Sequence, residues 1–191
     1  KLVFKLAGKT LLVAAACMVL PLLVTLLYRE DPMPFLSAMG ITALAGLLLS
    51  LLRADTRFNS REGFFSAGLI WLLVGFFGAL PFQFSGYFPS FVDCLFESIS
   101  GFTTTGASIL TAVEPLPKGI LFWRSFIHWL GGMGILVLTI ALLPSLGART
   151  LHVMKAESPG PIISKLVPKS SQSSKILYGI YLVLTVLVIL A

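Results

Sequence analysis

The chain has 191 residues, of which 57% are hydrophobic and 12% are charged, and its mean hydropathy is +0.95. Soluble domains carry about 25% charged residues, so this composition excludes an ordinary soluble domain and indicates that lipid solvates much of the chain. The net charge of +6 would suit nucleic acid or an acidic lipid surface, but the basic residues lie between the apolar runs, where membrane orientation explains them.

Long apolar runs set the expected architecture. A helix needs about 20 apolar residues to cross the hydrocarbon core of a membrane. Four runs come near that length, and a fifth stops with the sequence: residues 6–28, 34–52, 63–82, 119–147 and 176–191. Because the sequence starts with Lys1 and stops inside the fifth run, we expect both ends to be cuts in a longer chain. The predicted fold class is an all-α integral membrane protein.

The positions of the basic residues predict how these spans are oriented. Lys and Arg residues stay preferentially on the cytoplasmic side, in the short connections. Eleven of the fourteen lie before or near the start of the first run, between the second and third, or after the fourth. The other three are Arg29, Lys118 and Arg124. The amino terminus is therefore expected to be cytoplasmic.

Residues 88–102 (FPSFVDCLFESISGF) lie in the long connection between the third and fourth apolar runs. The third run leads outward and the fourth must return, yet 36 residues separate them. The segment is apolar enough to enter the membrane but, at about 1.5 Å per helical residue, too short to cross it. We expect a half-helix that dips in from outside, followed by non-helical backbone that is buried in protein or lines a water-filled cavity.

Residues 103–107, which follow the predicted half-helix, carry the chemistry expected of a cation filter. Gly101 is expected to end the helix through a positive φ, and Gly106 to take a conformation that a side chain would obstruct. Three threonines between them favour extended backbone whose carbonyl oxygens can replace the water around a potassium ion. The alternative is a polar surface turn. The candidate filter residues are Thr103, Thr104, Thr105 and Gly106.

Two acidic residues of the predicted half-helix, Asp93 and Glu97, lie four residues apart and share one helix face. They could attract cations near a pore mouth, or they could anchor the half-helix through hydrogen bonds to nearby backbone or to Arg124. We favour anchoring for Glu97, and for Asp93 a position facing the outer solution, where the helix dipole favours an acid. No nucleophile or metal-ligand set accompanies them, so an enzyme is not expected.

Arg124 and His128 lie four residues apart in the first third of the fourth run. Ionisable residues inside a membrane usually face protein or water. Because a fixed cation on the path of a cation would repel it, Arg124 is expected to brace the filter's surroundings. A lone histidine more often makes a structural hydrogen bond than relays protons, and we expect the same of His128.

Three glycines punctuate the middle of the fourth run: Gly131, Gly132 and Gly134. Glycines in a membrane helix let another backbone approach closely, which is the interpretation we favour. The other interpretation is a bend used in gating, which would leave the same pattern in the sequence.

Two longer motifs resemble the Trk/Ktr/HKT superfamily of cation transporters, and in particular its bacterial TrkH-like membrane subunits. They are FESISGFTTTGAS at residues 96–108 and FWRSFIHWLGGMGILVL at residues 122–138. Two long motifs at this separation are much more specific than the threonine-glycine run alone. The resemblance extends over essentially the whole chain.

The resemblance implies a potassium-channel-like repeat of helix, half pore helix, filter loop and helix, present four times in one polypeptide. The implied layout is an amino-terminal two-helix hairpin, the first pore repeat, a cytoplasmic linker and the start of the next repeat, at residues 1–57, 58–148, 149–175 and 176–191. The backbone carbonyls of Thr104 and Thr105 would coordinate K⁺, with Glu97 and Arg124 supporting the filter. In the family, glycine rather than serine at the Gly106 position goes with a preference for potassium.

The resemblance also implies partners. These are membrane lipid, the remaining repeats of the same polypeptide, a second copy in a homodimer, and a cytoplasmic TrkA-like ring of nucleotide-binding subunits, all at a bacterial inner membrane. The sequence has no glycine-rich phosphate loop, so nucleotide is expected only through the ring. Potassium is the expected transported ligand, with no covalent cofactor and no nucleic acid.

Three functions are compatible with these residues. The first is a pore subunit that conducts potassium passively, the second is a symporter that couples potassium to H⁺ or Na⁺, and the third is a non-conducting membrane scaffold or assembly subunit. Carbonyl-type filter residues, and the lack of a buried acid relay beyond Glu97 and His128, favour the first. The channel subunit of the potassium-pumping ATPase shares the pore architecture, but the second motif favours the Trk side.

Overall fold

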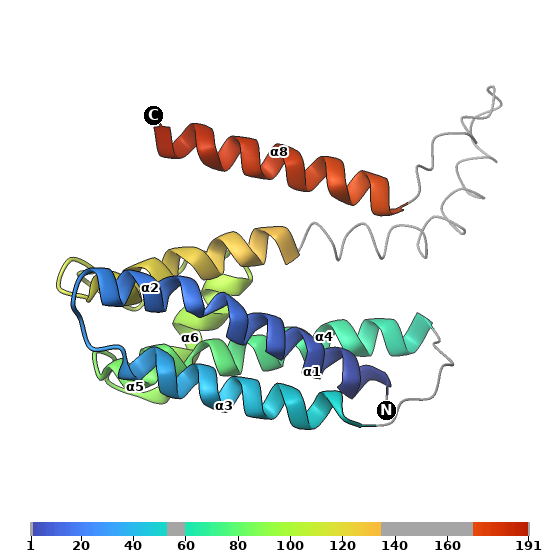
Figure 1. Ribbon diagram of the computed structural model, residues 1–191, viewed down its shortest axis with the longest axis horizontal. Helices are drawn as coiled ribbons and strands as arrows, with labels where there is room; N and C mark the ends of the chain where they lie inside the picture. The colour runs from blue at the N-terminus through green and yellow to red at the C-terminus, as the bar shows by residue number, and fades with distance from the viewer. Residues whose placement is uncertain (1, 53–59, 135–169, 191) are drawn as a thin grey trace. The chain divides into compact units, whose positions relative to one another are not determined.

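This computed structural model describes the backbone of residues 2–52, 60–134 and 170–190. The chain divides into two compact units, Lys1–Gly131 and Gly132–Ala191. Within the described ranges every regular element is a helix, which confirms the predicted all-α class (Figure 1). The second half of the predicted fourth span and most of the predicted linker lie outside the described residues.

Among the described residues of the first unit, three helical stretches are long and apolar enough to cross a membrane: Val3–Leu27, Met33–Ser50 and Phe65–Ser85. In the second unit, α8 (Ser170–Leu190) begins six residues before the start predicted near Ile176. Many large apolar side chains on these helices are exposed, as suits a surface that faces lipid or further protein. These lengths and compositions are those of an integral membrane protein.

The first stretch is interrupted where a proline removes a backbone hydrogen bond. α1 (Leu2–Cys17) and α2 (Val19–Leu27) are separated at Met18, and Pro21 follows in the first turn of α2. Pro21 has no N–H to donate to the carbonyl four residues earlier, so the helix breaks there. The Met18 carbonyl still accepts the N–H of Leu22 at 3.2 Å, and the two helices together make one span.

α1 and α3 (Met33–Ser50) lie side by side because two glycines let their backbones approach (Figure 1). A methyl group on Gly8 would lie 2.7 Å from the carbonyl oxygen of Gly46, and one on Gly46 would lie 2.9 Å from the carbonyl oxygen of Gly8. Real side chains do not tolerate such distances to backbone. Any larger residue at either position would therefore separate the two helices.

The third stretch covers most of α4 (Ser60–Gly78) and all of α5 (Leu80–Ser85), and these two helices are again divided close to a proline. α1 packs against α4, and α3 packs against α5. The carbonyl oxygen of Gly78, the last residue of α4, accepts a hydrogen bond from Nε1 of Trp123 at 3.0 Å. Trp123 is completely buried and belongs to helix 118–134, so this bond fixes that helix against the junction of α4 and α5.

A carboxylate from the loop after α2 caps the start of helix 118–134. Glu30 accepts hydrogen bonds from the backbone N–H groups of Lys118 at 2.7 Å and Gly119 at 3.0 Å. Both groups belong to the first turn of the helix, where the dipole favours a negative charge. Gly119 also lies so close to Oγ1 of Thr25 that a side chain would overlap it. The end of α2 and the start of this later helix are thereby held together.

α6 (Phe91–Phe102) is a short helix that packs against α4 and α5. The buried hydroxyl of Ser98 donates to the carbonyl oxygen of Gly75 on α4 at 2.7 Å. A methyl group on Gly78 would lie 2.5 Å from the ring of Phe102, so the end of α6 also sits directly against α4. These contacts fix the point from which the chain continues into residues 103–117.

Replacing Glu30 by Gln removes the charge of the helix cap. Hydrogen bonds to a charged group contribute about 1.5–3 kcal/mol, so we expect Glu30→Gln to lower the free energy of unfolding by about 1–2 kcal/mol. A lower thermal unfolding midpoint of the complete parent protein in detergent would measure this. Glu114→Gln is the matched control, because the Glu114 carboxylate accepts its hydrogen bond from the N–H of its neighbour Val113. Equal shifts in the two variants would contradict the role of Glu30.

Candidate functional site

α6 has twelve residues and is about 18 Å long, which is shorter than the hydrocarbon core of a membrane. The sequence predicts this helix over residues 88–102. It begins instead at Phe91, because Ser90 takes the extended conformation of an N-cap and its hydroxyl accepts the N–H of Asp93 at 3.3 Å. Asp93 lies half-buried in the first turn, where the helix dipole favours an acid.

α6 ends in a Schellman turn that has a threonine at the left-handed position. The N–H of Thr104 donates to the Gly101 carbonyl at 2.9 Å, and the N–H of Thr105 donates to the Ser100 carbonyl at 3.0 Å. Thr104 has φ 57°, which glycine adopts freely and β-branched residues rarely adopt. Holding a threonine there costs about 1–2 kcal/mol, so contacts around the turn must offset this strain.

Two predictions about this turn are wrong. Gly101 is helical, and the left-handed residue comes three positions later, at Thr104. The threonines are not uniformly extended, because Thr103 (φ −79°, ψ 0°) continues the helical conformation into the turn. Gly101 is needed for packing instead, since a methyl group on it would lie 2.5 Å from Cγ1 of Ile127. Gly106 does take a positive φ, 73°, as expected.

The hydroxyl groups of the three threonines bond within the turn. Oγ1 of Thr103 donates to the Ile99 carbonyl at 2.8 Å and lies 2.8 Å from Oγ1 of Thr105. Oγ1 of Thr104 donates to the Thr103 carbonyl at 2.7 Å. Residues 103–109 are exposed, whereas the last residues of α6 are buried. The turn is therefore anchored on one side and open on the other.

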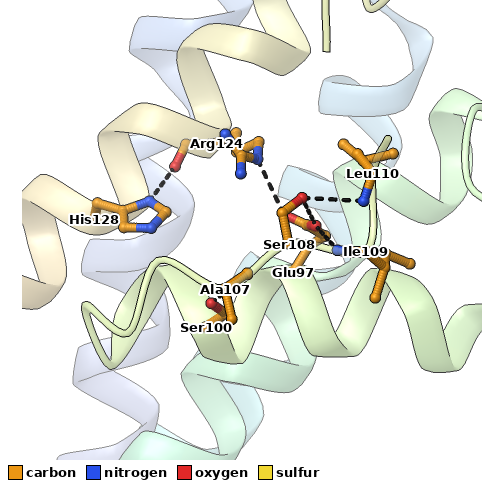
Figure 2. A network of polar contacts seen from close by, with 8 residues as sticks. All are labelled: Glu97, Ser100, Ala107, Ser108, Ile109, Leu110, Arg124 and His128. Atoms are coloured by element: carbon orange, nitrogen blue, oxygen red, sulfur yellow. Dashed lines mark hydrogen bonds and ion pairs between the residues drawn. The ribbon is translucent and has the colours of Figure 1, made fainter. Parts of the chain in front are cut away.

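Figure 2 shows how the carboxylate of Glu97 joins α6 to the returning segment and to helix 118–134. Oε1 accepts hydrogen bonds from Oγ of Ser108 and from the N–H of Ile109, the latter at 2.9 Å. Oε2 pairs with Nε of Arg124 at 3.0 Å. The Glu97 side chain is 1% exposed and that of Arg124 is 22% exposed, so the buried charge is compensated. These are the contacts of an anchor.

His128 lies beside the loop, one turn after Arg124 on the same helix. Its Nδ1 is 2.8 Å from the Arg124 carbonyl oxygen (Figure 2). Its Nε2 is 4.0 Å from the position that a methyl group on Gly106 would occupy. The ring therefore makes a structural hydrogen bond to its own helix while its far edge faces the left-handed glycine.

The three glycines predicted in the middle of the fourth run have different surroundings. A methyl group on Gly131 would overlap the carbonyl oxygen of Phe102 and lie 2.7 Å from its carbonyl carbon, so this glycine packs against the backbone at the end of α6. In the second unit, a methyl group on Gly132 would lie 2.6 Å from Oη of Tyr181. Gly134 is the last described residue of the segment. Gly131 thus makes the close backbone contact that helix packing requires.

Sequence reasoning missed several residues that position this site. The hydroxyl of Ser100, buried in α6, donates to the carbonyl oxygen of Ala107 at 2.6 Å (Figure 2). Ser108 reaches Glu97, and Glu30 caps the helix that carries Arg124. A usable signal was present for the serines, since a hydroxyl in an apolar half-helix must find a partner. The Glu30 contact joins distant parts of the chain, and no local pattern marks it.

The arrangement can hold backbone carbonyl groups in fixed positions beside a cation. The carbonyl end of α6 adjoins residues 103–106 and carries a partial negative charge. Within the described part of the chain, no group of three or more His, Cys, Asp or Glu side chains could hold a metal ion.

The chain is similar in sequence to known transport proteins. The sequence model of a family described as TrkH, cation transport protein, matches residues 33–191. The chain is 40% identical over 196 aligned positions to the Trk system potassium uptake protein TrkH of Halomonas elongata, covering 100% of this chain and 41% of that protein. It is 40% identical over 195 positions to the protein of the same name from Escherichia coli K12, covering 98% and 40%. The chain thus spans about two fifths of the length of these curated relatives.

The Glu97 and Arg124 side chains should be energetically coupled. Glu97→Gln keeps the shape and an acceptor oxygen but removes the charge, so we expect a loss of about 1.5–3 kcal/mol in the free energy of unfolding. Arg124→Gln should cost a similar amount, and the double variant should lose clearly less than the two single losses added together. Unfolding of the complete parent protein in detergent measures all three variants. Strictly additive losses would mean that the pair contributes nothing.

Gly131 should not tolerate a methyl group. Gly131→Ala would push helix 118–134 away from the end of α6, and we expect a loss of about 1–3 kcal/mol in the free energy of unfolding. Gly68→Ala is the matched control, because a methyl group on Gly68 of α4 has no atom within 4 Å. That variant should be neutral or more stable, since alanine favours helix by up to about 1 kcal/mol over glycine. A neutral Gly131→Ala would contradict the close contact.

Proposed function

Because the chain belongs to the TrkH family of cation transport proteins, we propose that it is the first pore repeat, with its amino-terminal hairpin, of a protein that takes up potassium through a selective pore. In this proposal residues 58–148 form one of four repeats, and Thr103, Thr104, Thr105 and Gly106 supply one quarter of the filter. K⁺ is coordinated by the backbone carbonyls of Thr104 and Thr105. The protein acts as a transporter and not as an enzyme.

The observation that carries the proposal is that the loop is both anchored and exposed. Glu97 and Ser100 hold residues 107–109 against α6 through hydrogen bonds. Residues 103–109 are nevertheless exposed. A selectivity filter needs this combination, because carbonyl oxygens that replace an ion's water shell must be both fixed and accessible to the ion.

The charges around the loop support a cation as the ligand. The partial negative charge at the end of α6 favours a cation beside residues 103–106. Arg124 would by itself oppose this, but its guanidinium pairs with the Glu97 carboxylate. The pair adds little net charge, so Arg124 can brace the loop without repelling the transported ion.

We further propose a bacterial inner membrane location with a cytoplasmic amino terminus. The supporting pattern is the excess of Lys and Arg in alternate connections. Arg29 and Lys118, two of the few basic residues assigned to the outer side, belong to the two segments that Glu30 joins. Because Glu30 brings these two segments together, Arg29 and Lys118 lie at the same end of the helices, as their assignment to one side of the membrane requires.

The proposed partners are the remaining repeats of the same polypeptide, a second copy of it, and a cytoplasmic ring that binds nucleotide. The relatives are named as parts of a Trk system, which supports more than one component. The basic stretch predicted as a linker at residues 149–175 is the candidate contact for the ring. Nucleotide would act through that partner.

Replacing Gly106 by Ser tests the filter assignment. The assay measures potassium and sodium flux in liposomes that contain the complete parent protein, where we expect potassium flux to exceed sodium flux. Serine in the left-handed conformation costs about 1–2 kcal/mol, and relief of this strain would displace the filter carbonyls. We therefore expect Gly106→Ser to lower the preference for potassium by about tenfold.

Gly86→Ser is the matched control, because Gly86 has nearly the same φ, 72°, with no atom within 4 Å of an added methyl group, but lies between α5 and α6. It should leave the preference unchanged. Unchanged flux and selectivity in Gly106→Ser would remove this loop from the pore and favour a non-conducting role.

A further inference from the structure

We propose that Ser100 is a positioning residue for ion selectivity, because its backbone carbonyl and its hydroxyl together orient three peptide groups of the loop, those between residues 104 and 105, 105 and 106, and 107 and 108. This inference rests on the proposed function. It concerns a residue of α6 that lies behind the loop, not a residue that would touch the ion.

Ser100 makes hydrogen bonds to three successive loop residues. Its carbonyl oxygen accepts the N–H of Thr105 at 3.0 Å and the N–H of Gly106 at 3.4 Å. Its hydroxyl donates to the carbonyl oxygen of Ala107 at 2.6 Å. Ser100 itself is buried, with 5% of the residue exposed, while its three partners lie in the exposed loop. One helical residue therefore fixes the loop at three points in a row.

The first two bonds determine where two carbonyl groups point. In a trans peptide, the N–H of one residue and the carbonyl of the residue before it point in opposite directions. The N–H groups of Thr105 and Gly106 are directed at Ser100, so the carbonyls of Thr104 and Thr105 are directed away from it. Those two carbonyls are the ones proposed to coordinate K⁺. Their orientation is thus set from α6.

The third bond determines where the row of carbonyls ends. The Ala107 carbonyl is turned toward the Ser100 hydroxyl, which is the reverse of the direction of the Thr104 and Thr105 carbonyls. This reversal occurs directly after Gly106, whose positive φ permits the change of direction. Without the hydroxyl, the peptide between Ala107 and Ser108 loses the bond that sets its carbonyl direction, and the adjoining peptide between Gly106 and Ala107, which carries the last filter carbonyl, is held less firmly.

α6 offers a matched comparison for the hydroxyl. Ser98 is also buried and also donates its hydroxyl to a backbone carbonyl, but its partner is Gly75 on α4, at 2.7 Å. Ser98→Ala and Ser100→Ala each remove one buried hydrogen bond from the same helix. A general effect on the packing of α6 should appear in both, whereas an effect on the loop should appear only in the second.

The test measures potassium, rubidium and sodium flux in liposomes that contain the complete parent protein, as wild type, Ser98→Ala, Ser100→Ala and Gly106→Ser. One hydrogen bond corresponds to about a two- to tenfold change in an equilibrium, so we expect Ser100→Ala to lower the potassium to sodium ratio by about that factor. Ser98→Ala should keep the wild-type ratio. Should Ser100→Ala fail to fold, Ser100→Cys, which keeps a weak donor, should give an intermediate ratio.

Each remaining outcome overturns the inference in a distinguishable way. If Gly106→Ser alters the ratio and Ser100→Ala does not, the filter assignment stands and the role of Ser100 is wrong. If Ser98→Ala lowers the ratio as much as Ser100→Ala, the effect belongs to the packing of α6. If the wild type shows no preference for potassium, or Gly106→Ser has no effect, the proposed function fails and the role of Ser100 fails with it.

Discussion

The buried carboxylate of Glu97 binds three parts of the first unit at once, and the returning segment depends on it for its position. An ionised carboxylate in an apolar interior is strongly unfavourable unless hydrogen bonds and an opposite charge surround it. Ser108, the N–H of Ile109 and Arg124 supply these partners from two different segments. Because each partner is needed, the segment has one register in which the charge is satisfied. A shift by one residue would put Ala107 or Ile109 in the place of Ser108, and neither has a hydroxyl to donate to the carboxylate.

The rest of the first unit brings Glu97 and Arg124 to this meeting point. Gly131 allows helix 118–134 to meet the backbone at the end of α6, and Gly101 leaves room for the Ile127 side chain. Trp123 holds that helix to α4 through its indole N–H. Glu30 fixes its first turn from the amino-terminal hairpin. This framework also offsets the strain of Thr104, which is held in the left-handed region by the turn that ends α6. Rigidity behind the loop is therefore what leaves its front free to bind.

The sequence was sufficient to predict the helices and the pairs of ionisable residues that share a helix face. It was insufficient for contacts such as the Glu30 cap, which join distant segments of the chain. Apolar runs predict the helices, and spacing by four residues places Asp93 with Glu97 on α6 and Arg124 with His128 on helix 118–134. The end of α6 was mispredicted because glycine is the usual left-handed residue, whereas here Gly101 is required for packing and Thr104 takes the strained conformation. The Glu30 cap was not predictable, because 88 residues separate it from its partner. A hydroxyl in an apolar half-helix indicates that Ser100 has a partner, but which carbonyl it reaches depends on the turn geometry, which has no simple sequence pattern.

Anomalous X-ray diffraction from rubidium-soaked crystals of the complete parent protein would test the central claim, that a loop fixed by Glu97 presents its carbonyls to a dehydrated ion. Rubidium is close to potassium in size and is located directly by its anomalous signal. The account predicts rubidium peaks in contact with the carbonyl oxygens of Thr104 and Thr105, with Glu97 still bonded to Ser108 and Arg124. Rubidium peaks along a path that avoids residues 103–106, or a loop detached from Glu97 while ions are bound, would contradict it.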